Sequence, residues 1–432
     1  MSQYDSPHPE DARNFAVTVV RQLRDAGYQA VWAGGCVRDQ LLGITPKDYD
    51  VATNAEPAEV RGVFGRRRTL EMGAAFGVVT IVGTPRSGHI EVATFRRDAE
   101  YSDGRRPDSV IYSSAEEDAA RRDFTINGLF FDPLEERVID YVDGQADLAR
   151  ELIRAIGEPE DRIAEDKLRM LRAVRIAAKL RFDIDPHTLQ AIRERSGEIH
   201  IVSPERIGAE MRRILAAPNP ALGVQWLVKT RLLDEVAPEL HGTPAIPEHL
   251  LDLERALSQL GDANEGFCLC LGVSLLLAGA SQQQLDDLTA RWRLSNHEVK
   301  ELRRLMRDVP RLMRADQLNW PELQRILAED CGPPAPEPTH SVAGPALRAA
   351  RVIVAVRGGD RGVVTAEQAI RSPREQWDPP RLVSGDDLRD LGMRPGPRFR
   401  DILEQLRDEQ LLGNATTREA LLAIAKELAA DH

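Results

Sequence analysis

Apolar residues recur at helical spacing at the start of the chain and again over most of its second half. In residues 11–26, Phe15, Val19 and Leu23 share one face, and Gly27 follows as a helix stop. The same spacing predicts further helices at residues 160–181, 187–195, 204–216, 220–231, 249–260, 266–279, 282–291 and 296–313. The chain is therefore predicted to be mostly helical beyond its first third.

Strand-like runs, by contrast, are confined to the first third of the chain. Runs rich in Val, Ile, Ala and Thr predict strands at residues 28–35, 48–53, 76–84 and 89–96. A short helix, CVRDQLLG, lies between the first two runs and closes at Gly43. A head that mixes strands and helices, followed by a helical remainder, places the chain in the α+β class.

Composition narrows the class of protein. At 432 residues, 42% hydrophobic and 29% charged, the chain reads as a globular protein with more than one domain. No apolar run approaches the ~20 residues of a membrane span, and the polar, acidic N-terminus does not resemble a signal peptide, so we expect a cytoplasmic protein without membrane contact. The net charge of −12 argues against non-specific coating of nucleic acid. The cysteines lack metal-type spacing, which favours buried free thiols.

Two aspartates one residue apart, Asp48 and Asp50, stand at the second predicted strand. Residues i and i+2 of a strand share a face, so two carboxylates would repel unless divalent cations lie between them. Mg²⁺ binds through one or two carboxylates together with phosphate oxygens. Glu91 is the candidate third carboxylate, because Ile90 and Val92 on either side of it would face the core. The alternative is a polar strand end or turn.

A diglycine turn precedes this pair. Gly34 and Gly35 permit close backbone approach, the following helix offers free N–H groups to a triphosphate, and Arg38 is a candidate charged clamp. The GxxxxGK[ST] pattern of a Walker loop is absent. The alternative is a plain strand–turn–helix connection.

The segment RRDFTING offers two guanidiniums, Arg121 and Arg122, for phosphate, and the carboxylate of Asp123 for ribose hydroxyls. The alternative for Asp123 is a helix cap. Local basic clusters in this part of the chain are also candidates for contact with RNA: Arg96, Arg105 and Arg106.

A stripe of charged residues follows in EDKLRMLRAVR. Asp166 and Arg169 are three apart and are expected to share a helix face that Arg172 and Arg175 continue. An acceptor beside a forked donor suits the edges of cytosine and adenine, whereas guanine and uracil invert that pattern. The pair would thus accept CTP and ATP; the alternative is an intrahelical salt bridge.

These motifs together resemble the class II tRNA nucleotidyltransferase and bacterial poly(A) polymerase family. GGCVRD…DYD, RRDFTING, YVDGQADL and EDKLRMLRAVRIAAKL match the family's first four motifs in order and spacing over residues 30–182. The tail GDDLRDLGMRPGPRFRDILEQL resembles the branch that adds CCA or A. The resemblance implies a polymerase-β-like head with a mixed sheet. It also implies four parts, namely a head at 1–145, a helical neck at 146–215, a helical body at 216–330 and a linker with a helical tail at 331–432.

The resemblance also assigns roles to residues of this chain. Asp48, Asp50 and Glu91 would be the catalytic carboxylates and would hold Mg²⁺. The implied nucleotide-binding residues are Gly34, Gly35, Arg38, Arg121, Arg122, Asp123, Asn127, Asp166, Arg169, Arg172 and Arg175. The implied partners are CTP, ATP and the acceptor arm and elbow of tRNA, and the oligomeric state stays open.

The sequence departs from the family at two places. Gly128 stands where many relatives have Ala, which is expected to loosen the packing after the second motif. The body resembles a degenerate His-Asp phosphohydrolase region in which His249 remains but no His-Asp dipeptide follows, so we predict no phosphohydrolase activity.

Several activities stay open within this resemblance. CCA addition is the leading interpretation, and addition of the terminal A alone, beside a separate CC-adding enzyme, is the second. CC addition alone is less favoured, because CC-adding enzymes tend to lack the flexible loop that is full length here, FRRDAEYSDGRRPDSVIYS. Poly(A) polymerase activity is also less favoured, because the chain has no strongly basic C-terminal extension to hold mRNA. A non-catalytic RNA-binding protein is the alternative from a different class.

Overall fold

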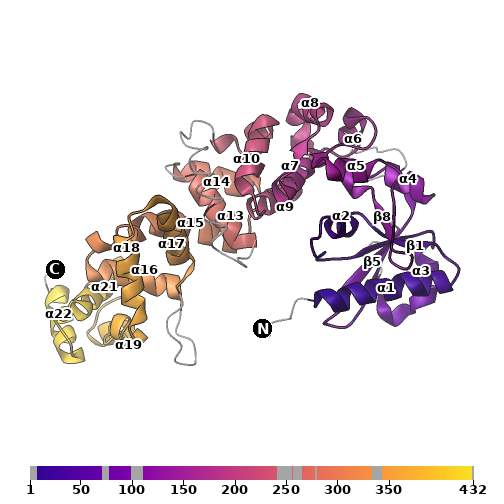
Figure 1. Cartoon of the computed structure of the whole chain (residues 1–432). Coiled ribbons are helices and arrows are strands. Elements are labelled where there is room, and N and C mark those ends of the chain that lie inside the picture. The colour runs from indigo at the N-terminus through magenta and orange to yellow at the C-terminus, as the bar shows by residue number, and fades with distance from the viewer. Residues whose placement is uncertain are drawn as a thin grey trace. The chain divides into compact units, whose positions relative to one another are not determined.

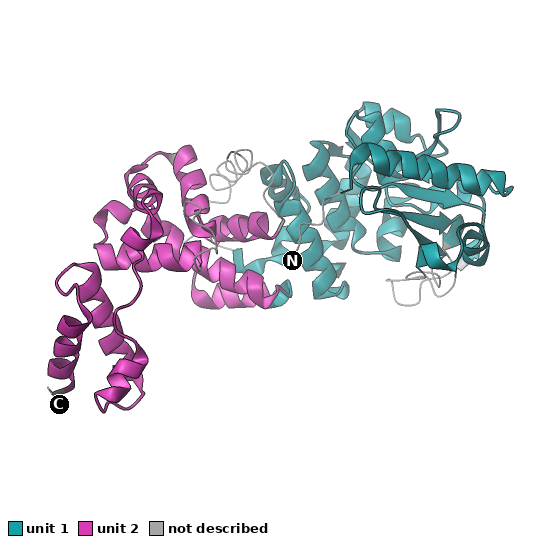
Figure 2. Cartoon of the chain, turned by 90° about the horizontal axis from the view of Figure 1, so that it is seen from below, with its two compact units in different colours: residues 1–241, 290–293 teal, residues 242–289, 294–432 magenta. Residues whose placement is uncertain are grey.

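The structure is a computed structural model that describes residues 7–70, 77–98, 110–240, 255, 265–277, 280–332 and 343–430. The chain divides into two compact units (Figure 2). One comprises Met1–His241 and Ala290–Arg293, and the other Gly242–Thr289 and Leu294–His432. The finer division at residues 145, 215 and 330 stays a prediction.

A seven-stranded sheet forms the centre of the first unit, in the order β3-β4-β5-β2-β1-β8-β9. Its strands are β1 (Ala30–Ala33), β2 (Asp50–Thr53), β3 (Thr69–Leu70), β4 (Val78–Val82), β5 (His89–Thr94), β8 (Phe130–Asp132) and β9 (Arg137–Ile139). The β2–β5 pair is parallel and the other neighbouring pairs are antiparallel. The predicted α+β class with a mixed sheet is confirmed.

Helix α1 (Pro9–Asp25) lies across strands β1, β2 and β5 (Figure 1). Its apolar face, which includes the fully buried Val19 and Leu23, covers one side of the sheet. On β1, Trp32 is fully buried and its ring lies 4.8 Å from that of Tyr49. The residue between the two aspartates is therefore a core residue that anchors the start of β2.

Short helices connect the strands of the head. They are α2 (Gly35–Leu41), α3 (Pro57–Phe64), η1 (Arg66–Arg68), α4 (Ala115–Ala120), η3 (Thr125–Asn127) and α5 (Gly144–Ala149). Two small sheets accompany them, β6 (Arg96–Asp98) with β7 (Val110–Tyr112), and β10 (Leu152–Ile153) with β11 (Asp183–Ile184).

Helices make up the rest of the described part of this unit, two of them between β10 and β11 and the others after β11. They are α6 (Pro159–Glu165), α7 (Arg169–Leu180), α8 (Pro186–Arg195), η4 (Ser196–Ile201), α9 (Pro204–Leu215), α10 (Pro220–Lys229), α11 (Leu232–Val236) and η5 (Pro238–Leu240). The single helix predicted at residues 160–181 is wrong, because the chain breaks between α6 and α7. At the break Asp166 is extended (φ −143°, ψ 106°), and its carboxylate accepts from the N–H of Leu168.

The later part of the chain, mostly in the second unit, is helical throughout its described residues. Its elements are α13 (Glu265–Leu276), α14 (Gln282–Arg291), α15 (Asn296–Leu312), η6 (Ala315–Gln317), α16 (Trp320–Cys331), α17 (Pro345–Arg357), α18 (Arg361–Arg371), α19 (Arg374–Trp377), α20 (Gly385–Asp390), α21 (Pro397–Leu411) and α22 (Arg418–Ala430). The predicted helix at 249–260 and His249 lie outside the described residues, apart from the helical Arg255. Where the structure describes the chain, no helix has the length and apolar character to cross a membrane.

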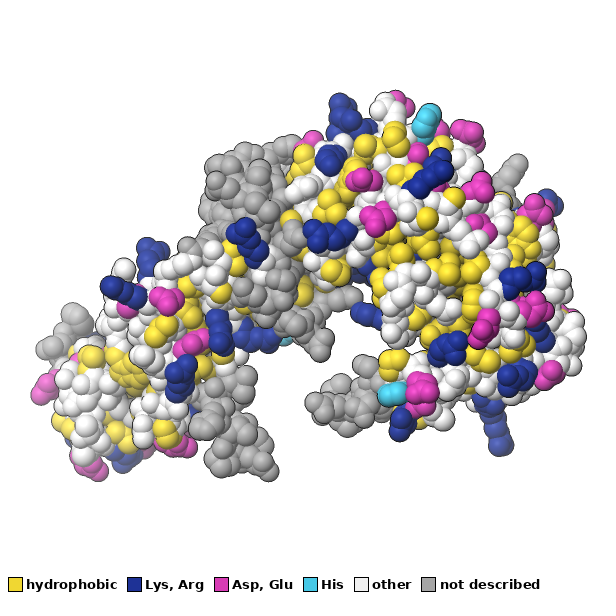
Figure 3. All heavy atoms as spheres, in the orientation of Figure 1, with side chains coloured by type: hydrophobic (Ala, Val, Ile, Leu, Met, Phe, Trp, Pro, Cys, Tyr) yellow, Lys and Arg dark blue, Asp and Glu magenta, His cyan; other side chains and the backbone are white. Residues whose placement is uncertain are grey.

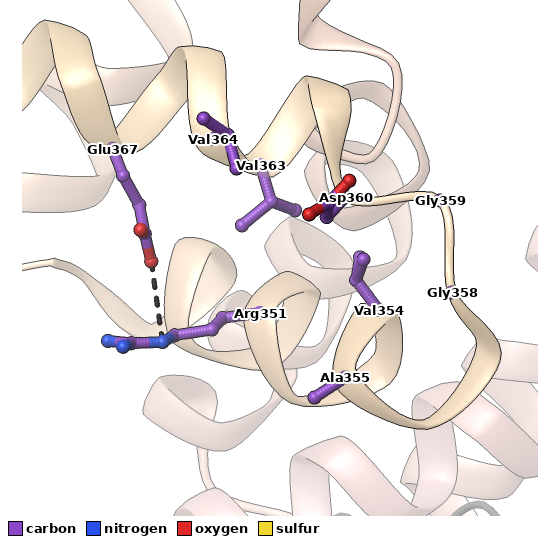
Figure 4. Close-up of a pocket in the computed structure, with 9 residues that line it drawn as sticks. All are labelled: Arg351, Val354, Ala355, Gly358, Gly359, Asp360, Val363, Val364 and Glu367. Atoms are coloured by element: carbon purple, nitrogen blue, oxygen red, sulfur yellow. Dashed lines mark ion pairs between the residues drawn. The ribbon is translucent and has the colours of Figure 1, made fainter.

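An open groove of about 480 Å³ lies between α17 and α18 in the second unit (Figure 4). The ion pair between Arg351 and Glu367, 3.4 Å apart, bridges one end, and the turn at Gly358 and Gly359 closes the other. The four cysteines are free, as predicted; three are buried, but Cys331 is half-buried.

Candidate active site

Asp50 and Glu91 stand directly opposite each other on the parallel strands β2 and β5. Both side chains are exposed, whereas Ile90 and Val92 are each 1% exposed, as the alternation of β5 predicts. Desolvation by surrounding protein atoms and the charge of Glu91 raise the pKa of Asp50 to about 6, although Arg122 opposes the shift. The two strands thus hold two carboxylates against their mutual repulsion at one edge of the site.

Asp48 is not on the same strand, contrary to the prediction. β2 begins at Asp50, and Asp48 lies in the bend before it because the buried Tyr49 turns the chain into the sheet. The charge of Asp48 still contributes to raising the pKa of Asp50, so the two carboxylates share one neighbourhood. The DxD motif supplies one carboxylate from the strand and one from the bend.

A divalent cation suits this donor set. Among the described residues, no three Asp, Glu, His or Cys side chains gather closely enough to hold a metal ion by themselves. Carboxylate oxygens are the hard donors that Mg²⁺ takes in ones and twos beside phosphate oxygens. The repulsion that raises the pKa of Asp50 is also what a bound cation would offset.

Gly34 forms the turn between β1 and α2, and Gly35 begins α2. Gly34 has φ +75°, and its N–H donates to the carbonyl of Leu129 at 3.0 Å. A Cβ built at Gly34 would lie 2.9 Å from Nη1 of Arg122. A guanidinium is thus the group that lies against the backbone at Gly34, and the approach of a triphosphate to this turn stays a prediction.

Asp118 holds both arginines of the RRDFTING segment, and the sequence-based prediction missed it. One carboxylate oxygen accepts from Arg121 at 2.7 Å and the other from Arg122 at 2.9 Å. Burial by itself would raise the pKa of Asp118, but the two guanidiniums lower it. The signal was present in AEEDAARR, where an acid lies three and four residues before the arginines on one helical turn.

Arg38, Asp123 and Asn127 lie inside the head rather than on its surface. Nη1 of Arg38 donates to Oδ1 of Asn127 at 2.6 Å, and Nδ2 of Asn127 donates to Oδ1 of Asp123 at 3.0 Å. Burial by itself would raise the pKa of Asp123, but Arg172 and the Asn127 amide hold it well below its usual range. The three residues support the turn around Gly34, and the clamp predicted for Arg38 stays a prediction.

Asp166 and Arg169 do not share a helix, which corrects the prediction. Asp166 follows α6 and pairs with Arg206 at 2.9 Å, whereas Arg169 is the first residue of α7. Arg169 pairs with Glu165 at 2.6 Å and donates to the carbonyl of Arg121 at 3.1 Å. The alternative of a salt bridge between Asp166 and Arg169 is also wrong, since each has another partner.

The remaining arginines of the stripe each meet a buried carboxylate. Arg172 contacts Asp123 at 2.6 Å, and Arg175 contacts Glu210 at 2.6 Å. Burial lowers the pKa of Arg175 in spite of Glu210. Helix α7 is thus tied to the head on one side and to α9 on the other.

Two further predictions concern the candidate RNA-contacting arginines and the packing at Gly128. Arg96 is half-buried on β6 and its carbonyl accepts from Arg121 at 2.9 Å, whereas Arg105 and Arg106 lie outside the described residues. The loosening expected at Gly128 is not seen, because a Cβ there would lie 2.6 Å from Cγ2 of Val142. Val142 already fills the space that an alanine would need.

Charge is mixed on the face of the molecule seen in Figure 3. Lys and Arg side chains alternate there with Asp and Glu side chains over the helical regions. Contact with RNA through this face would therefore depend on individual cations placed between acids.

Comparisons with known proteins identify the family of this chain. The family model "Poly A polymerase head domain" matches residues 30–154, and "Probable RNA and SrmB- binding site of polymerase A" matches residues 181–242. A CCA-adding enzyme of Levilactobacillus brevis is 32% identical over 424 residues, which cover 97% of this chain and 98% of that protein. One of Limosilactobacillus fermentum is 31% identical over 414 residues, 95% of this chain and 96% of that protein.

A solved structure agrees as well. The Bacillus stearothermophilus CCA-adding enzyme in complex with CTP matches this fold with a TM-score of 0.76 at 26% identity, covering 99% of this chain and 98% of that one. The glycine turn, the opposed carboxylates and helix α7 thus lie in a chain that matches such enzymes along nearly its whole length. The chain belongs to the nucleotidyltransferase family of CCA-adding enzymes, with a poly(A)-polymerase-type head.

Proposed function

We propose that this chain adds C, C and A to the 3′ end of tRNA, using CTP and ATP without a nucleic-acid template. The observation that carries the proposal is the opposition of Asp50 and Glu91 beside the Gly34 turn, where Arg122 lies. A triphosphate at that turn would meet backbone N–H groups and a guanidinium. We place the protein in the cytoplasm, where tRNA and both nucleotides are present.

Asp48, Asp50 and Glu91 are the residues that would hold Mg²⁺. When bound, Mg²⁺ supplies charge neutralisation at the reacting phosphate and at the leaving pyrophosphate. The tRNA 3′ oxygen forms a bond to the α-phosphorus while the bond to the pyrophosphate oxygen breaks. The protein's part is to place the two reactants, with Arg122 held by Asp118 for the triphosphate and Arg169 and Asp166 for the base.

Product length at single-nucleotide resolution tests this proposal. Purified protein and Mg²⁺ are given three transcripts of one tRNA, ending at the discriminator base, at C and at CC, with CTP, ATP or both. We expect three additions to the shortest transcript when both nucleotides are present. A single A added only to the CC transcript would instead identify an A-adding enzyme, and long A tails a poly(A) polymerase.

A second arm separates an enzyme from a non-catalytic RNA-binding protein. Asp50→Asn removes one carboxylate of the opposed pair and is expected to abolish addition, whereas Glu116→Gln, at an exposed position of α4, is the matched control. Mn²⁺ binding followed by paramagnetic resonance should weaken in the first variant only. A wild-type protein that adds nothing and binds no Mn²⁺ would favour the non-catalytic alternative.

A further inference from the structure

A closed ring of ion pairs and hydrogen bonds joins helix α7 to helix α2, which follows the Gly34 turn, and to the segment from Asp123 to Asn127. It starts at Lys179, whose Nζ contacts Oδ2 of Asp39 at 2.8 Å. The other oxygen of Asp39 accepts from Nε of Arg38 at 2.8 Å and from Nη2 at 2.6 Å. Both oxygens of one carboxylate are thus used, one toward α7 and one toward the helix that follows the Gly34 turn.

The second half of the ring returns to α7. Arg38 bonds to Asn127 and Asn127 bonds to Asp123, at the distances given above. Oδ2 of Asp123 then accepts from Nε of Arg172 at 2.8 Å and pairs with its Nη2 at 2.6 Å. Arg172 and Lys179 are seven residues apart, two turns of one helix, so they lie on the same face of α7.

Burial makes this ring more than a set of surface pairs. Its four middle members, Arg38, Asp39, Asn127 and Asp123, are between 6% and 8% exposed. Buried charges need partners for every lone pair and proton, because water does not supply them. If α7 moved along the head, either Asp39 would lose its contact with Lys179 or Asp123 would lose its contact with Arg172.

We propose that Lys179 and Asp39 are positioning residues that set the place of α7 against the Gly34 turn, and thereby help to select the nucleotide. The proposal rests on the proposed function, because Arg169, the first residue of α7, is the base-reading candidate. Arg172 connects the first half of α7 to Asp123, and Lys179 connects the last turn of α7 to Asp39. Loss of the second tie allows the helix to tilt, and the tilt moves Arg169.

The first test compares Lys179→Met with Arg193→Met, which removes an exposed charge from α8 outside the ring. The CC-ended transcript is given ATP or GTP, and kcat and KM are measured for each. In Lys179→Met we expect discrimination against GTP to fall about tenfold, through a higher KM for ATP with kcat much less affected. Lys179→Arg should restore part of it, and Arg193→Met should match the wild type.

Unchanged discrimination in Lys179→Met would overturn the proposal, whether or not the variant is less stable. Asp39→Asn and the double variant add a check, because the second substitution should cost little once the first has opened the ring. Additive losses of discrimination would mean that the two residues act separately.

Hydrogen exchange in the absence of nucleotides supplies a readout that does not depend on activity. We expect amides of the first turn of α7, Arg169–Arg172, to exchange faster in Lys179→Met, although they lie two turns from the substitution. Unchanged exchange there would overturn the positioning role. If the wild-type protein is inactive in the transcript assay, that result counts against the proposed function. The hydrogen-exchange result alone then decides whether the ring positions α7.

Discussion

Asp50 on β2 and Glu91 on β5 are in register across a parallel strand pair, which places two carboxylates side by side on neighbouring interior strands of the sheet. Backbone pairing fixes this spacing, so neither residue can move away from the other without breaking the ladder. Desolvation, and after it the negative charge of Glu91, raises the pKa of Asp50 to about 6. A cation bound at the proposed site would offset this cost of ionising Asp50.

The pH dependence of stability should report this repulsion. Because the folded protein binds the Asp50 proton more tightly than the unfolded chain does, this group stabilises the fold below about pH 4, and the contribution is lost as pH rises through 6. In metal-free protein, Asp50→Asn should therefore raise Tm at pH 7.5 by about 1 to 2 °C, a modest gain because the carboxyl is open to solvent. At pH 4 the two proteins should melt alike.

Differential scanning calorimetry in a chelating buffer measures this effect. Asp401→Asn, an exposed position on α21, is the control and should leave Tm unchanged at both pH values. A gain of equal size at both pH values, or a loss at pH 7.5, would show that Asp50 is not strained by its neighbours.

Removal of Asp118 should release the two arginines that it holds. Asp118→Ala leaves Arg121 and Arg122 without their shared buried carboxylate, and we expect the free energy of unfolding to fall by about 3 kcal/mol. KM for the nucleotide should rise as well, because Arg122 would no longer be held at the turn. Urea denaturation of this variant and of Glu116→Gln, on the same helix, gives the comparison; a loss below about 0.5 kcal/mol would contradict it.

Two glycines with a similar positive φ differ in how crowded they are. Gly34 has φ +75° and Gly43 has φ +70°, but only at Gly34 does a Cβ meet a neighbour, Arg122. We expect Gly43→Ala to destabilise by about 1 kcal/mol and to leave activity unchanged, and Gly34→Ala to cost about 3 kcal/mol and raise KM for the nucleotide. Equal effects of the two substitutions on KM would mean that the approach of Arg122 to the turn is not needed.

Nucleotide choice should depend on how Asp166 is held as well as on Asp166 itself. Asp166→Ala removes the acceptor that we propose reads the base, and should reduce discrimination between CTP and UTP by about 10- to 100-fold. Arg206→Met leaves the carboxylate in place but removes its 2.9 Å partner, so we expect a smaller loss in the same direction. Single-nucleotide incorporation on the discriminator-ended transcript measures both. Full discrimination in Asp166→Ala would remove this residue from the base-reading role.

Local signals predicted many of the helices and strands, whereas the roles assigned to the site residues stay predictions. The alternation around Glu91 and the apolar spacing of α1 depend on neighbours within a few positions of the chain, and the structure agrees with both. The order and type of elements, and hence the α+β class, follow from the same short-range patterns. The resemblance across residues 30–182 added the family, which no local pattern supplies.

Helix boundaries and charge partners were decided by the tertiary structure. The spacing of Asp166 and Arg169 is that of one helix face, but the Asp166 carboxylate accepts from the N–H of Leu168 in the break between α6 and α7. The same carboxylate pairs with Arg206, 40 residues away, and not with Arg169. Asp39 and Lys179 are 140 residues apart, so no periodicity joins them. The sequence by itself determined which charges the chain carries and, through local patterns, which stretches tend to form helices or strands. Only the folded protein decided which distant charges meet, because a buried carboxylate needs a cation, and for Asp39, Asp123 and Glu210 the packing of distant segments supplies one.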